Sequence, residues 1–439
     1  MKVKVVREKV VKPCKPTPPH LRTYKLSLLE ETNPSINHIR LFYFSSSDDG
    51  RLIDEKKIVC LEESLAQILP SFYPLAGRYV KEKREVDCND QGAQYSTAEV
   101  DCDLSQIVGG AAEVEPEQLN QLLPVDIAAV DEPTDPMLAV QINRFRCGSL
   151  AIGVCASHRV IDSAAFAQFV TAWATAAASG GSQLIQPHFD NHSCFPAENL
   201  PPLDYHESET PEKIVTKRYV FDNKAIEKLR ERLSKEWKSE RPPSRVVAVS
   251  AFLTQAVLRA DRARRSGKPR AAVIGQLINI RERTVPSVPK NTFGTWISGS
   301  FLELTAAETV EENLPGLAAK MRWSVQKGVS DCASVLSNKA FFRKVVIDSF
   351  FEAAEKANSP DWKVIWVTDI SKFSEYDVDF GFGKPVWVSF AAMPLQDHII
   401  LFSNKNNDGF EAWVCLQETD MQFFRQDEEI PLLTANVWV

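Results

Sequence analysis

The sequence lacks the cysteine and histidine patterns of a disulfide-stapled or metal-binding protein. Its nine cysteines form an odd, scattered set without a C-x-x-C pair, which indicates neither a disulfide framework nor a zinc site. The seven histidines include no H-E-x-x-H pair, so a catalytic metal is not predicted either. These absences favour a reducing, cytoplasmic location and a protein without a resident metal or cofactor.

An excess of positive charge and a long apolar run are also missing. The 51 basic and 58 acidic residues give a formal charge of −7. This charge does not indicate a basic surface for binding nucleic acid or an anionic membrane. The most apolar long segment, AAFAQFVTAWATAAA, is too short to span a bilayer and contains glutamine and threonine. The first residues, MKVKVVREKVVKP, interleave charges with valines, a pattern typical of a first strand rather than of a secretory signal. We expect no nucleic-acid and no membrane partner.

The composition is that of a globular protein with sizeable cores, because 44% of the residues are hydrophobic and 25% are charged. A length of 439 residues is too great for one ordinary core and favours two domains. Proline, polar and acidic residues replace the apolar periodicity around 187–213, which is typical of a linker. We therefore predict an N-terminal domain over 1–190, a linker over 191–213 and a C-terminal domain over 214–439.

Helical and strand patterns alternate in both halves, which predicts layered α/β domains. Apolar spacing predicts a helix that ends at Pro70, and a second helix that follows a cap at Asp162 or Ser163. A third helix is predicted from Ser244 to near Gly267. Strands are predicted over 138–146, 150–157, 271–283, 386–393, 398–404 and 409–416, the first two joined by a turn at Cys147-Gly148-Ser149.

The stretch CASHRVIDSAAF (155–166) contains the strongest candidate for chemistry. His158 ends a predicted buried strand, and an imidazole with a pKa of ~6.5 suits general-base work worth ~10² to 10⁴ in rate. The alternative is a histidine satisfied by hydrogen bonds in the core. Cys155 and Ser157 are weaker nucleophile candidates, because an odd separation places them on the opposite strand face from His158. Asp162 is expected to cap the helix or anchor the loop, with a dyad partnership as the open alternative.

Two other patterns invite a functional interpretation. Asp379-Phe380-Gly381 resembles the metal-binding D-F-G of kinases, but the other kinase motifs are missing; Gly381 and Gly383 indicate a tight connection before a strand. Asn279, Arg281 and Arg283 alternate and are expected to share one face of a strand. That face is either solvated, or it carries an arginine that reaches a phosphate or the loop of Asp162.

Six segments spread over nearly the whole chain match motifs of one known family. In order, they are FYPLAGR (72–78), VDCND (86–90), SHRVID (157–162), SRVVAVSAF (244–252), NIRERTVPSVP (279–289) and DFGFGKP (379–385). Together they resemble the BAHD family of plant CoA-dependent acyltransferases, particularly its vinorine-synthase-like branch. H-x-x-x-D alone is a weak signal, but its combination with N-x-R-x-R and a D-F-G-W-G-like motif is specific.

The resemblance implies two chloramphenicol-acetyltransferase-like α/β domains with a solvent channel at their interface. His158 would be the general base of a direct transfer without a covalent acyl-enzyme, and Asp162 would bond to Arg281 and hold the loop. Asp379, Gly381 and Gly383 would support the architecture. Thr368, Asn279 and Ser250 are candidates for the oxyanion or CoA side.

Three positions depart from the family pattern. Phe382 and Ile370 stand where tryptophan is usual, and Ser163 stands where many relatives have glycine. The loss of the indole at Ile370 is expected to affect the shape and polarity of the pocket next to Thr368.

The resemblance implies an acyl-CoA-dependent O-acyltransferase, with acetyl-CoA as cosubstrate and a hydroxyl of a plant specialised metabolite, such as an alkaloid or terpenoid, as acceptor. A monomer is expected. The alternatives are an N-acyltransferase on an amine and a non-catalytic protein of the same fold that binds CoA or a metabolite. A condensation-type domain also carries H-x-x-x-D, but no carrier module accompanies it here. The identity of the acceptor has no local sequence signature.

Overall fold

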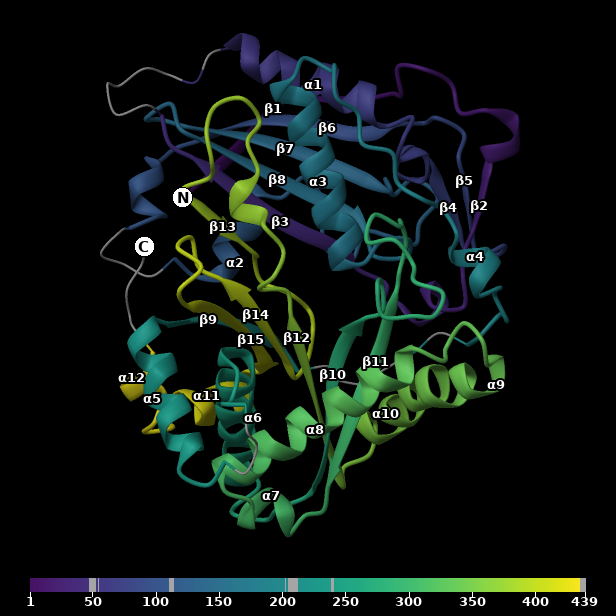
Figure 1. Ribbon diagram of the computed structural model, residues 1–439. Helices are drawn as coiled ribbons and strands as arrows, with labels where there is room; N and C mark the ends of the chain where they lie inside the picture. Colours follow the sequence, from purple (N-terminus) through teal and green to yellow (C-terminus); the bar gives the residue numbers. More distant parts are fainter. Residues whose placement is uncertain are drawn as a thin grey trace.

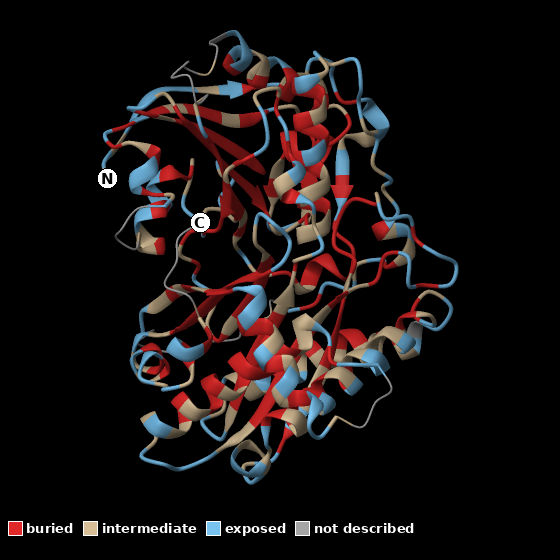
Figure 2. Cartoon of the chain, turned by 60° about the vertical axis from the view of Figure 1, so that its left-hand side comes forward, coloured by how far each residue is buried: buried red, intermediate tan, exposed pale blue. Residues whose placement is uncertain are grey.

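Two large mixed sheets, each with helices packed against it, form the upper and lower halves of the molecule (Figure 1). The computed structural model describes residues 1–46, 53, 55–109, 114–201, 203, 212–237 and 241–434. Buried residues concentrate along the two sheets and on the helix faces that pack against them, while the outer helix faces are exposed (Figure 2). This is the layered α/β architecture expected from the alternating sequence pattern.

The first sheet has six strands and is built mainly from the N-terminal half. All neighbouring pairs are antiparallel except β6 with β7. In spatial order the strands are β1 (Val3–Val11), β6 (Ala93–Val100), β7 (Leu138–Phe145), β8 (Leu150–Ser157), β3 (Asn37–Phe44) and β13 (Trp387–Ser389). Every residue of β8 is buried, as expected for a central strand covered on both faces.

The second sheet also has six strands, and its middle strands run parallel. In spatial order they are β11 (Ile297–Leu304), β10 (Ala271–Asn279), β12 (Trp362–Asp369), β14 (His398–Ser403), β15 (Phe410–Gln417) and β9 (Ile214–Phe221). A small third sheet joins β2 (Thr23–Lys25), β5 (Glu85–Asp87) and β4 (Arg78–Val80). The carboxyl ends of β10 and β12 and the first residues of β14 lie at one edge, where they supply side chains to the cavity described below.

The helices cover the sheets in two groups. In the first half they are α1 (Glu55–Ile68), α2 (Pro116–Leu119), α3 (Ser163–Ala178) and α4 (Asn191–Cys194). In the second half they are α5 (Asn223–Ser234), α6 (Arg245–Arg264), α7 (Glu308–Glu311), α8 (Leu314–Cys332), α9 (Lys339–Phe342), α10 (Ser349–Ala357), α11 (Glu418–Arg425) and α12 (Ile430–Leu433). A π-helical segment, Arg343–Asp348, joins α9 to α10. Helices α1 and α3 lie side by side on one face of the first sheet (Figure 1).

Side-chain caps start the long helices where the sequence predicts them. Asp162 accepts a hydrogen bond from the backbone N–H of Ala165 at the start of α3, and Ser244 accepts one from Val247 at the start of α6. Such caps satisfy backbone donors that have no partner within the helix. The predicted cap and helix ends are confirmed, with α6 ending at Arg264, shortly before Gly267.

The C-terminal half returns to complete the first sheet. β13 pairs with β3, so residues 387–389 extend a sheet whose other strands all precede residue 160. Trp387, Phe390 and Trp413 join the same hydrophobic core as the side chains of the first half. The predicted division into domains at 191–213 stays a prediction; residues 202 and 204–211 of that segment lie outside the described residues.

The predicted strands at 138–146, 150–157, 398–404 and 409–416 are confirmed as β7, β8, β14 and β15, whereas of the strand predicted over 386–393 only Trp387–Ser389 is present, as β13. The strand expected over 271–283 is shorter, because β10 ends at Asn279 and residues 281–283 form a turn. The prediction that Asn279, Arg281 and Arg283 share one strand face is therefore wrong. Arg281 turns inward and is 4% exposed, whereas Arg283 is exposed to solvent.

Candidate active site

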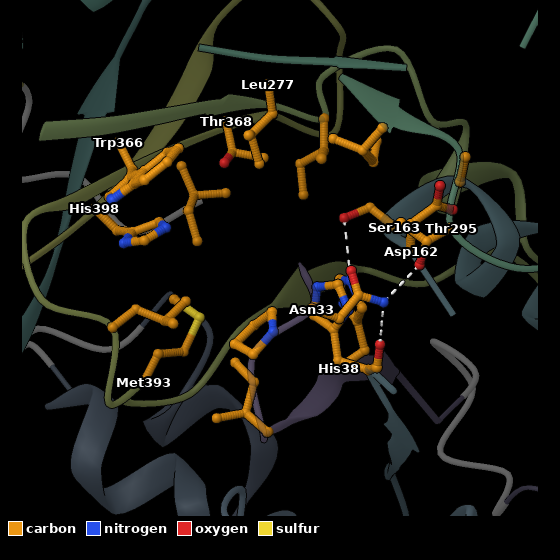
Figure 3. A pocket seen from close by; sticks show the side chains of 18 of the residues that line it. Asn33, His38, Asp162, Ser163, Leu277, Thr295, Trp366, Thr368, Met393 and His398 are labelled. Atoms are coloured by element: carbon orange, nitrogen blue, oxygen red, sulfur yellow. Dashed lines mark hydrogen bonds between the residues drawn. The ribbon is translucent and has the colours of Figure 1, made fainter. Parts of the chain in front are cut away.

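A cavity of about 210 Å³ lies between the two halves and contains His158 in its wall. From the first half, β3, the residue after β8 and the start of α3 line it; from the second half, the ends of β10, β12 and β14 line it. Figure 3 shows His38, Asn33 and Ser163 on one side and Trp366, Thr368 and His398 on another. The lining is mainly apolar with a few convergent polar groups, as is typical of a small-molecule site.

His158 is held by its backbone. Its N–H donates to the carbonyl of Ile36 at 2.9 Å, and its carbonyl accepts from Asn33 Nδ2 at 2.6 Å. Asn33 Nδ2 also donates to Thr295 Oγ1 at 2.6 Å, so this amide ties the backbone of His158 to the second half. The ring is partly exposed to the cavity, which does not fit a histidine satisfied in a dry core.

Burial lowers the pKa of His158 below its ordinary value, and this effect outweighs the opposing influence of its own backbone carbonyl and of Asp162. Arg159 lowers the pKa of His158 further. A lowered pKa keeps the imidazole neutral at physiological pH, which is the form that accepts a proton.

The carboxylate of Asp162 bonds to groups that hold the surrounding chain in place, not to the imidazole of His158. It caps α3 through Ala165, accepts from the backbone N–H of Trp296 at 3.0 Å, and forms a two-point ion pair with Arg281. Arg281 Nη1 lies 2.7 Å from Oδ2 and Nη2 lies 3.2 Å from Oδ1. The guanidinium of Arg281 also donates to the backbone carbonyls of Thr292 and Gly294. Both oxygens of Asp162 are thus occupied by contacts that fix the loop 158–162.

The wall opposite His158 contains Thr368 and an aromatic stack. Thr368 lies at the end of β12 with its hydroxyl facing the cavity (Figure 3). Two residues earlier, Trp366 stacks on His398 with ring centroids 6.0 Å apart and on Phe350 at 5.8 Å. Ile370 also lines the cavity and is 3% exposed. An aliphatic side chain therefore occupies the position where tryptophan is expected from the motif.

The other predicted site residues divide between the cavity and its surroundings. Asn279 lines the cavity, and its Oδ1 accepts from the backbone N–H and from Nη1 of Arg281. Ser250 lies within α6, is 2% exposed, and is not among the residues that line the cavity.

The loop around Asp379 makes a tight turn away from the cavity. Asp379 Oδ1 accepts from the backbone N–H groups of Gly381 at 2.7 Å and Gly383 at 2.9 Å. Both glycines have positive φ, +95° and +96°, a backbone region that other residues rarely adopt. The ring of Phe382 packs edge-on against Phe44 with centroids 4.7 Å apart. These contacts fit the expected architectural role.

Cys155 and Ser157 lie inside the first sheet. Burial raises the pKa of Cys155 to about 12, so its thiol is not an activated nucleophile. Ser157 has no exposed surface, and neither residue lines the cavity. Neither residue is therefore placed to act as a nucleophile in this cavity.

His38 and Asn33 were not predicted from the sequence. His38 lies on β3 beside His158, with ring centroids 4.4 Å apart, and both rings line the cavity. Neither residue belongs to a motif, and the separation of about 120 positions along the chain hides the contact. The mostly apolar stretch that follows His38, residues 39–44, could have suggested a strand that begins near His38, but nothing in it predicts pairing with β8.

Comparison with known proteins places this geometry among transferases. The family model described as "Transferase family" matches residues 1–430. A pelargonidin 3-O-(6-caffeoylglucoside) 5-O-(6-O-malonylglucoside) 4'''-malonyltransferase from Salvia splendens is 34% identical, over 99% of this chain and 100% of its own length. Stemmadenine O-acetyltransferase from Catharanthus roseus is 30% identical, over 97% of this chain and 96% of its own length. The crystal structure of vinorine synthase superposes with a TM-score of 0.84 at 29% identity, over 100% of both chains.

The part of the chain that the structure describes contains no helix long and apolar enough to cross a bilayer. Within the same residues, no three His, Cys, Asp or Glu side chains gather closely enough to hold a metal ion.

Proposed function

The chain belongs to the Transferase family, the BAHD acyltransferases, and from that premise we propose that it moves an acetyl group from acetyl-CoA to a hydroxyl group of a plant specialised metabolite. Members of the family use acyl-CoA donors and small-molecule acceptors. The acetyl group and the hydroxyl acceptor are the parts proposed here for this chain.

In the proposed reaction, His158 accepts the proton of the acceptor hydroxyl as the oxygen attacks the thioester carbonyl. A tetrahedral intermediate forms, and the Thr368 hydroxyl donates a hydrogen bond to its oxyanion, a contact of a kind worth ~3 kcal/mol. The C–S bond then breaks, and the proton held by His158 passes to the departing CoA sulfur. The products are the ester and CoA-SH, and no side chain becomes acylated.

The observation that carries this proposal is the placement of His158 and Thr368 in one cavity. They come from different halves of the chain, and both line the space in which a thioester and a hydroxyl would meet. The lowered pKa of His158 supports its role as a base. The contacts of Asp162 with Arg281 support a holding role for the carboxylate. Asn279 accepts a hydrogen bond from Arg281, so its proposed role is to help fix the Asp162–Arg281 pair rather than to bind the oxyanion.

The cavity walls support a largely apolar acceptor, such as an alkaloid or terpenoid alcohol. Its apolar side chains are contributed by both halves and include Ile36, Ile39, Leu277, Ile297, Phe350, Trp366, Ile370, Phe373, Phe390, Met393, Leu395 and Ile400. Burial of such surface provides the main binding energy for an apolar ligand.

The test is a panel of acyl-CoA donors and candidate alcohols and amines, with CoA-SH release and product mass followed together. We expect an ester product with acetyl-CoA, and we expect His158→Ala to remain folded while turnover falls by ~10² to 10⁴. An amide product would show that the enzyme acylates an amine rather than a hydroxyl group. Binding of CoA without any product, or full turnover by His158→Ala, would refute the proposed reaction.

A further inference from the structure

A second imidazole lies directly against the His158 ring. His38 on β3 has its ring centroid 4.4 Å from that of His158, with 30° between the ring planes. Phe166 on α3 stacks on His38 at 5.5 Å, also at 30°. His38 is thus in ring contact with both the proposed base and a fully buried phenyl ring.

Ser163 holds this second imidazole. Its Oγ lies 3.3 Å from His38 Nε2, within hydrogen-bond distance, and Figure 3 shows both residues on the same side of the cavity. Ser163 is the first residue of α3, directly after Asp162. Because Asp162 is fixed by Arg281, the hydroxyl of Ser163 sits on a rigid support. In a relative with glycine at this position, no such hydroxyl would be present.

We propose that His38 is a positioning residue for His158: its ring holds the base by face contact and shields it from water, while Ser163 sets the orientation of the His38 ring. This inference rests on the proposed function of His158 as general base. Misplacement of a reacting group by about 1 Å can cost ~10² in rate. Contact with the fixed ring of His38 would keep the His158 imidazole in its reactive position.

The charges around the pair favour an uncharged His38. Burial, followed by His158 and Arg40, lowers the pKa of His38 well below its ordinary value. Arg40, two residues along β3, is itself paired with Glu375. These influences favour the neutral form of His38 at physiological pH.

The groups that face His158 come from other elements. Asp162 is paired with Arg281, and Arg159 is paired with Asp131. Across the cavity, Asp369 on β12 and His398 on β14 are the titratable residues of the opposite wall. A replacement at His38 leaves all of these groups in place.

The shielding role has a pH signature. Burial is the largest cause of the lowered pKa of His158, and the His38 ring covers one of its faces. Removal of that ring admits water and returns the pKa of His158 toward its ordinary value. The acid limb of kcat/KM then moves to higher pH. A phenyl ring would preserve the cover.

The experiment compares wild type with His38→Ala, His38→Phe and Ser163→Gly, using an acceptor found in the panel. His20→Ala, which removes an exposed histidine, is the matched control and should equal wild type. We expect His38→Ala to lower kcat by about 10- to 100-fold, to leave KM for acetyl-CoA unchanged, and to shift the acid limb upward. His38→Phe keeps the flat ring but loses the bond to Ser163 Oγ, so it should keep the acid limb of the pH profile and lower kcat about as much as Ser163→Gly does. Both variants should lower kcat less than His38→Ala. If His38→Ala does not fold, His38→Leu, which fills the space without a flat ring, takes its place.

A wild-type kcat and acid limb in His38→Ala, beside an inactive His158→Ala, would overturn this inference and leave the proposed function standing. An equal loss in His38→Phe and His38→Ala would also overturn it, because ring contact would then not be the operative property. No product from wild type with any donor and acceptor would instead refute the proposed function itself.

Discussion

Asp162 and Arg281 form a buried two-point ion pair although 119 residues separate them in the chain. Asp162 begins α3 beside the first sheet, and Arg281 lies in the turn that follows β10 of the second sheet. Their side chains are 2% and 1% exposed. The pair therefore links the loop of His158 to the second half of the protein, and the position of the proposed base depends on both halves.

We expect Asp162→Asn to destabilise the fold rather than to remove a reacting group. The substitution leaves the Arg281 guanidinium buried without its counter-charge, and the loss of one partner of a buried pair typically costs ~3 to 5 kcal/mol. Urea unfolding of the purified variant measures this loss. Activity should fall in proportion to the folded fraction under assay conditions.

The matched control is Asp103→Asn, which breaks an ion pair with Arg146 at the surface. Solvent and salt screen such a pair, so its unfolding curve should lie close to that of wild type. If Asp162→Asn unfolds like wild type but is as inactive as His158→Ala, the catalytic dyad interpretation of Asp162 becomes the better one.

Much of this arrangement follows from local sequence. The cap at Asp162, the apolar spacing from Phe166 and the turn at 147–149 predict β7, β8 and α3 because each depends on neighbours in the chain. The loop that carries His158 is therefore visible from a short segment. The motif resemblance adds Arg281 as the partner of Asp162.

The long-range parts could not be predicted in this way. The alternation of Asn279, Arg281 and Arg283 suggested a continuing strand, but the buried carboxylate of Asp162 draws Arg281 inward where the chain turns. The three-residue strand β13 joins the first sheet through pairing with β3, more than 340 positions earlier. The contact of His38 with His158 depends on the pairing of β3 with β8. Each outcome is decided by tertiary packing.

The pH dependence of the reaction should report the environment of His158. Its pKa lies below the ordinary value of 6.5 because of burial, so the imidazole stays unprotonated to lower pH than a free histidine. We expect kcat/KM for an alcohol acceptor to be level at neutral pH and to fall only as pH drops through a midpoint below 6.5. Rate measurements between about pH 5 and 8 test this; a midpoint at or above 6.5 would contradict the buried geometry.

Thr368 provides a test of the opposite wall. If its hydroxyl donates to the oxyanion, Thr368→Val, which preserves shape, should lower kcat by ~10² to 10³. KM for acetyl-CoA should change little, because the bond is strongest in the transition state. Thr368→Ser retains the hydroxyl and is the matched control, with most of the activity expected to remain. Equal kcat for the valine and serine variants would remove Thr368 from the mechanism.

Glu30 should make stability fall as pH rises, the reverse of an ordinary surface carboxylate. It is fully buried, and burial raises its pKa from 4.5 to about 7 despite hydrogen bonds from the Tyr24 hydroxyl and the Ser27 backbone N–H. The folded state thus binds this proton more tightly than the unfolded state. The stability linked to protonated Glu30 is complete below about pH 4.5 and is lost as pH rises to about 7.

The difference between the folded and unfolded pKa corresponds to about 3 kcal/mol. Glu30→Gln removes the titration and keeps an oxygen that can accept from Tyr24. The free energy of unfolding of the variant minus that of wild type should therefore increase between pH 5 and pH 8, by an amount approaching this value. All other titrating groups are common to both proteins and cancel in the difference. A difference that stays constant with pH would show that Glu30 is already ionised in the folded protein at pH 5.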